Sequence, residues 1–271
     1  MTEDNPPKFE TIADLPDDDL KKIISKYLDY LCDMGISIER INSEGKEYSD
    51  NLLKTKSLFD NNKLTPILQK TLWSKTLASL VMFSPYYESR VLLYTHIHME
   101  LDKHQIDYFE PIKDERSRIE SVSRSFERLQ NAIPSSSHSE ALIQLFTRII
   151  EVVEYNLLKS VNLLPDTTLF DLEEIFSVCG KVKRNTVYVT RGKALRDAFN
   201  HSRYDTDGEG YDITIKINNQ KDGYNFQCKY TLPEFANYID KLHKLHILFV
   251  NTSYLFYLNN LFRHYFSRVS T

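Results

Sequence analysis

Apolar residues recur along most of this chain at intervals of three and four, which is the spacing of one face of an α-helix. The first such face comprises Leu20, Ile24, Tyr27, Leu28 and Leu31. The carboxylates of "PDDDLKK" favour a helix start just before it, and we expect Gly35 to end that helix. Further helices are predicted over 37–60, 65–83, 84–104 and 114–133.

The C-terminal half begins with a stretch that is typical of a linker. "PSSSHSE", residues 134–140, separates two helical patterns, and Ser137 with Glu140 forms a capping box at which a new helix is expected to begin. The same periodicity predicts helices over 138–160, 166–178, 191–200 and 231–266. Thr231 and Glu234 form a second capping box in front of the last of these.

Between the last two helices the period changes from helical spacing to strict alternation. Apolar residues take every second position in "YDITIKI" and again in "YNFQCKY", and the turn residues "NNQKDG" lie between them. This pattern predicts a β-hairpin over 211–230, with Tyr211 through Ile217 on one apolar face. "DTDGEG", which precedes it, is expected to be a turn and not a calcium loop, because Lys216 stands where such a loop needs a glutamate.

Composition agrees with a mostly helical protein. Only 7 of the 271 residues are Gly and 9 are Pro, and a scarcity of these residues favours long helices. We therefore expect a disordered tail over 1–16, a helical N-terminal region over 17–133, and a helical bundle carrying the hairpin over 134–271. The apolar surplus of the last helix must be covered by the N-terminal helices or by another subunit.

Targeting signals and membrane spans are not expected. The N-terminus is acidic and polar, unlike a signal or transit peptide. The most apolar run, 246–262, contains several Asn, Ser and Thr residues, which favours a buried helix over a membrane span. The three cysteines form no Cys-x-x-Cys motif. We expect a cytoplasmic protein that does not enter the membrane.

Positive charge gathers in one short segment although the chain as a whole carries a net charge of −4. Between 181 and 203 the only acidic residue is Asp197, and the basic residues are Lys181, Lys183, Arg184, Arg191, Lys193, Arg196 and Arg203. A local cluster of this kind is what contacts with nucleic-acid phosphates require.

The same segment contains the pattern Arg-polar-x-x-x-His in "RDAFNH", from Arg196 to His201. The pattern resembles the signature of HEPN domains, the higher eukaryotes and prokaryotes nucleotide-binding family. A second Arg–His pair, Arg90 and His96, lacks the polar residue and lies in an apolar helical pattern, so we interpret it as structural. The resemblance covers only the C-terminal half of the chain.

The resemblance implies a fold and an activity. HEPN signatures lie on four-helix bundles that meet as homodimers and cut RNA without a metal ion, and many members are toxins or antiviral defence effectors. By this resemblance Arg196, Asp197, Asn200 and His201 would form the catalytic set. An RNA substrate, a second copy of the chain and an antitoxin or defence-system partner would be its partners, with no cofactor and no metal.

Each residue's role in this mechanism follows from its chemistry. His201 would act on the 2′-hydroxyl as general base or on the leaving 5′-oxygen as general acid. Arg196 would stabilise the phosphoryl oxygens, while Asp197, one helical turn before His201, would orient the imidazole ring. Arg191, Lys193 and Arg203 would hold the RNA backbone.

A second interpretation from a different class uses the same residues. Arg196 would pair with a carboxylate, His201 would cap a helix end, and the protein would be an inactive helical scaffold that binds a protein or a nucleic acid. On an ideal helix Arg196 and His201 lie about 140° apart. The nuclease hypothesis therefore needs His201 at a frayed helix end, facing a second protomer.

Two histidines elsewhere offer a weaker candidate site. His243 and His246 in "HKLH" share one helix face, but no Cys or acidic cluster supplies the third ligand that a metal site needs. We interpret them as core histidines.

Overall fold

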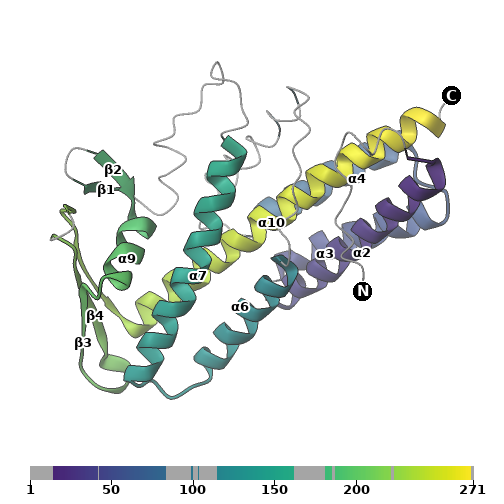
Figure 1. Ribbon diagram of the computed structural model, residues 1–271. Helices are drawn as coiled ribbons and strands as arrows, with labels where there is room; N and C mark the ends of the chain where they lie inside the picture. The colour runs from purple at the N-terminus through teal and green to yellow at the C-terminus, as the bar shows by residue number, and fades with distance from the viewer. Residues whose placement is uncertain are drawn as a thin grey trace. The chain divides into compact units, whose positions relative to one another are not determined.

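Figure 1 shows the computed structural model of the chain, in which helices predominate. The structure describes residues 15–41, 43–83, 99, 103, 115–161, 181–184, 187–220 and 223–269. The tail predicted over 1–16 and the helices predicted over 84–104 and 166–178 lie wholly or almost wholly outside the described residues. Because one of the four predicted bundle helices is among them, the described residues confirm a mostly helical fold and no more specific bundle.

The chain forms two compact units. One comprises Met1–Arg116 with Leu248–Thr271, and the other comprises Ser117–Ile247. The domain boundary expected at residue 134 stays a prediction, since compact units defined by contacts need not coincide with independently folding domains. None of the helices within the described ranges is both long and apolar enough to cross a membrane.

The first unit begins with three helices: α2 (Asp17–Ile41), α3 (Glu44–Asp60) and α4 (Pro66–Met82). All five apolar residues predicted for the first helical face are buried. The expected stop at Gly35 is wrong, because α2 continues for six more residues. A Cβ at Gly35 would lie 3.1 Å from Leu52 Cδ1 and 3.3 Å from Ser49 Cα, so the glycine permits close packing of α3 against α2.

The same unit contains the second half of α10 (Leu232–Val269). Aromatic rings from the three N-terminal helices cover it: Tyr27 packs on Tyr257, Phe59 on Phe262, and Trp73 on Phe256. Two side-chain hydrogen bonds join the same elements. Tyr48 Oη donates to Asn251 Oδ1 at 2.8 Å, and Gln69 Nε2 donates to Asn259 Oδ1 at 2.9 Å. The N-terminal helices therefore cover the apolar surplus of this half of α10.

The second unit contains α6 (Glu115–Gln130) from Ser117 onward, α7 (Ser136–Val161), α9 (Arg191–Asn200) and the first half of α10. The side chain of Ser135 accepts the first capping hydrogen bond of α7, from the amide of His138 at 3.4 Å, in place of the Ser137 expected from the capping box. At α10 the predicted capping box is confirmed. The Thr231 amide donates to Glu234 Oε2 at 2.8 Å, and the Glu234 amide donates to Thr231 Oγ1 at 3.3 Å.

Two small antiparallel sheets complete this unit. In one, β1 (Lys181–Arg184) pairs with β2 (Val187–Thr190). The other has the order β3–β4–β5, formed by β3 (Tyr204–Asp207), β4 (Thr214–Asn218) and β5 (Gln227–Thr231). The predicted hairpin is thus present as β4 and β5, and the sequence pattern missed β3.

The inner face of the three-stranded sheet follows the predicted alternation, with one exception. Ile213, Ile215, Ile217 and Tyr224 are buried, whereas Tyr211 is 71% exposed. Tyr211 lies in a 3-10 turn, Gly210–Asp212, where the period of two no longer applies. The sheet therefore presents an apolar face to the core and a polar face to solvent.

Candidate functional site

A hydrophobic face fixes α9, the helix that carries the motif. Ala194, Leu195 and Ala198 are fully buried, and Phe199 is 7% exposed. The Phe199 ring packs edge-on against Phe146 of α7, with the ring centroids 5.6 Å apart. Because these residues fill one side of α9, Arg196, Asp197 and Asn200 are left on its other sides, where Asn200 is exposed.

The motif helix ends as a Schellman motif. The Arg203 amide donates to the Ala198 carbonyl at 2.7 Å, and the Ser202 amide donates to the Phe199 carbonyl at 3.1 Å. Ser202 takes the left-handed conformation that this motif requires, with φ of 50°. His201 is therefore the C-cap residue. Its amide donates to the Asp197 carbonyl, and its side chain is exposed.

The expected helix end at residue 200 is thus confirmed, but this end is capped and not frayed as the nuclease hypothesis expected. The backbone of His201 is fixed by the capping hydrogen bonds, while its exposed ring lies outside the core.

Asp197 has different partners from those expected. Its Oδ1 is 3.3 Å from Nη2 of Arg196, and its Oδ2 accepts a hydrogen bond of 2.5 Å from the hydroxyl of Tyr224. Arg196 and Asp197 are 21% and 20% exposed. No hydrogen bond between Asp197 and the His201 side chain occurs among the described contacts.

The difference arises because the helix stops before His201. An i, i+4 pairing needs helical geometry through both residues, and α9 ends at Asn200. Tyr224, just before β5, supplies a donor from the opposite side instead. The sequence contained a signal for this contact: alternation placed Tyr224 on the inner sheet face, and a buried tyrosine hydroxyl needs a polar partner.

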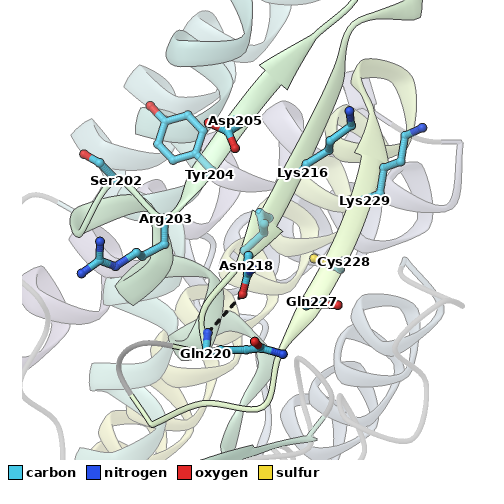
Figure 2. Close-up of a pocket in the computed structure, with 11 residues that line it drawn as sticks. Ser202, Arg203, Tyr204, Asp205, Lys216, Asn218, Gln220, Gln227, Cys228 and Lys229 are labelled. Carbon is cyan, nitrogen blue, oxygen red and sulfur yellow. Dashed lines mark hydrogen bonds between the residues drawn. The ribbon is translucent and has the colours of Figure 1, made fainter.

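A pocket of about 720 Å³ opens beside the end of α9, over the polar face of the three-stranded sheet (Figure 2). Residues 202–205, 216–218, 220 and 227–229 line it. Arg203 is among these lining residues. Lys193, Arg196 and His201 are not among them, although His201 directly precedes the first lining residue.

The structure describes the side chain of only one of the two remaining residues predicted to bind RNA, Lys193 and Arg191. Lys193 is partly exposed on α9. Arg191 is the first residue of that helix, and its side chain lies outside the described part of the structure, as do the side chains of β1 and β2.

His243 and His246 are buried, at 4% and 2% exposure, as expected for core histidines. The His243 Nε2 lies 3.1 Å from Ser123 Oγ of α6. Burial, together with smaller effects of the neighbouring His246 and Lys244, lowers the pKa of His243 to about 3. Within the described residues, no group of three or more His, Cys, Asp or Glu side chains could hold a metal ion.

Comparisons with protein-family models, with curated proteins and with solved structures find no match to this chain. Function must therefore be argued from the site itself.

Proposed function

We propose that this protein is a metal-independent endoribonuclease of the HEPN type, which acts as a homodimer in a toxin or defence system. His201 carries this proposal. It is exposed at the end of an anchored helix, between Arg196 and Arg203 in the sequence and next to an open pocket. A general base needs such access to substrate on a support that does not move.

The chemistry would be a transesterification. His201 would take the proton of the 2′-hydroxyl or, in the partner protomer, protonate the leaving 5′-oxygen. The 2′-oxygen would form a bond to phosphorus as the bond to the 5′-oxygen breaks, leaving a 2′,3′-cyclic phosphate and a 5′-hydroxyl. Arg196, held by Asp197 and through it by Tyr224, would stabilise charge on the non-bridging oxygens.

The decisive experiment compares RNA cleavage in EDTA by the wild type, His201→Ala and Arg196→Gln. His264→Ala, on the part of α10 that belongs to the other unit, is the matched histidine control. We expect His201→Ala to lower the cleavage rate by roughly 10²- to 10⁴-fold and His264→Ala to leave it unchanged. Cleavage that survives His201→Ala, or that EDTA alone abolishes, would sink the mechanism.

Dilution tests the dimer. If two protomers complete one site, the specific activity should fall once the protein is diluted below its dimer dissociation constant, measured by sedimentation. A specific activity that stays constant across the dimer-to-monomer transition would contradict a shared site.

A second candidate function is supported by the Arg196–Asp197 ion pair. Arg196 is only 21% exposed and is paired with a carboxylate, which also fits an inactive scaffold that binds a protein or nucleic acid. The same assay separates the two functions, because a scaffold would show no cleavage by the wild type.

A further inference from the structure

The solvent-facing side of the three-stranded sheet has a regular polar arrangement. Strand register places Lys216 of β4 directly opposite Lys229 of β5, and Asn218 directly opposite Gln227. All four side chains are exposed and line the 720 Å³ pocket. Figure 2 shows the two lysine side chains extending side by side from neighbouring strands.

Two like charges directly opposite each other destabilise a sheet, so this pair calls for a compensating anion. Lys216 has one within the chain, because its Nζ lies 2.8 Å from Asp207 Oδ2. Asp205, which also lines the pocket, lies directly opposite Lys216 on β3. Lys229 forms no direct ion pair among the described residues, although Asp207 and Glu234 attract it at longer range. The Lys229 ammonium is therefore the group on this face that an external anion would neutralise most.

The rest of the face offers hydrogen-bonding groups and a direct link to the motif. Asn218 and Gln227 carry side-chain amides. The backbone N–H of Gln220 donates to Asn218 Oδ1 at 3.3 Å. The backbone N–H of Asn218 donates to the backbone carbonyl of Arg203 at 3.1 Å. Since Arg203 follows His201 by two residues, this hydrogen bond fixes the sheet face to the end of the motif helix.

We propose that this face, defined by Arg203, Lys216, Asn218, Gln220, Gln227 and Lys229, holds a single strand of RNA by its phosphates and leads it to His201. This inference rests on the proposed nuclease function and adds a substrate track to it. Tyr204 is the one aromatic residue among those that line the pocket, and it is half-buried with its ring against Phe199. It lies opposite Ile217 on the inner side of the sheet, so contacts with phosphates outweigh stacking with bases on this face. Binding is therefore driven by phosphates, tolerant of sequence and sensitive to salt.

The test measures binding of a fluorescein-labelled single-stranded RNA in the full-length His201→Ala background, so that the probe stays intact. Lys216→Gln/Lys229→Gln is compared with Lys70→Gln/Lys75→Gln, which removes the same charge from exposed positions of α4. Lys229→Gln alone is included because it leaves the Lys216–Asp207 ion pair in place. Thermal unfolding confirms that each variant is folded.

We expect Lys229→Gln to weaken binding by roughly three- to tenfold at low salt, while the α4 pair has no effect. The slope of log affinity against log salt should become shallower by about 0.7 for each phosphate that the variant no longer neutralises. An unchanged slope and affinity in the sheet variants, or an absence of RNA binding to the parent protein, would overturn the proposed track. So would tighter binding of polyglutamate than of the RNA at equal charge.

Failure of the track and failure of the nuclease give different results. If the wild type cleaves RNA and the sheet variants cleave it equally well, the nuclease stands and the track is wrong. If binding depends on Lys229 but no cleavage occurs, the track stands and the nuclease is wrong.

Discussion

The two halves of α10 are both buried among aromatic rings, yet they bury different polar groups. Leu232–Ile247 packs in the unit that carries the motif helix and buries His243 and His246. Leu248–Val269 packs against the N-terminal helices and buries Asn251, which accepts a hydrogen bond from Tyr48. A hydroxyl–amide pair is neutral at any pH near 7, whereas a histidine can be protonated as the pH falls.

This difference determines which unit should lose folding stability as the pH changes. Burial lowers the pKa of His243 to about 3, so its folded ring stays neutral where an unfolded ring would be charged. The unit with the proposed site should therefore lose stability in acid, and the unit of the N-terminal helices has no corresponding buried histidine among its described residues.

The largest effect is expected from matched truncations of two buried rings. Phe146 and Phe262 are 0% and 2% exposed, one in each unit, and each packs on other rings. Phe146→Ala and Phe262→Ala should each lower the free energy of unfolding by about 3–5 kcal/mol, measured by urea denaturation. Only Phe146→Ala should also speed hydrogen exchange in α9, because Phe146 contacts Phe199. Equal exchange in both variants would remove the distinction.

The next effect concerns pH. Below about pH 6.5 the unfolded His243 ring binds a proton that the folded ring does not bind until about pH 3. The stability that this residue contributes should therefore fall by about 1.4 kcal/mol per pH unit as pH drops through that window. His243→Phe, which keeps a neutral ring beside Phe126, should flatten the pH dependence measured by urea denaturation. Parallel curves for wild type and variant would contradict it.

A smaller effect is expected at the neutral pair of the other half. Tyr48→Phe removes the donor to Asn251 and should lower stability by about 1–2 kcal/mol, by the same amount at pH 5 and pH 8. Tyr48→Phe/Asn251→Leu should recover part of the loss, because both polar groups are then absent. A loss of stability that differs between pH 5 and pH 8 would show that this half of α10 also contacts a group that titrates in that range.

The smallest effect is expected at the start of α10. Thr231→Ala removes the side chain that accepts from the Glu234 amide and should lower stability by about 1 kcal/mol. Thr214→Ala, at the directly opposite position of β4, removes no helix cap and should change stability less. Thermal unfolding of the two variants provides the measurement, and equal shifts would contradict a capping role for Thr231.

Local patterns predicted local structure well. Alternation identified the buried isoleucines of β4, the Thr231–Glu234 capping box was found in advance, and the end of α9 was placed at the right residue. Each of these depends on residues within a few positions of one another, where spacing and side-chain chemistry are sufficient.

Contacts between distant segments were missed. The Tyr224 hydroxyl donates a hydrogen bond to the Asp197 carboxylate, which lies 27 residues earlier in the sequence. The pocket forms only because β3 joins the predicted hairpin. Gly35 was expected to end a helix, but it allows α3 to approach α2. In each case the partner is chosen by packing between elements, which periodicity does not encode.

The outer strand β3 has a consequence for how the protein behaves in a crowded solution. Its four residues include Asp205 and Asp207, in a stretch whose sequence predicts a turn and which instead begins within a strand. In the structure these exposed carboxylates lie along the open edge of a sheet. A short, charged edge repels the backbone of another copy. The two aspartates thus disfavour aggregation through the pairing of β3 with a strand of another copy.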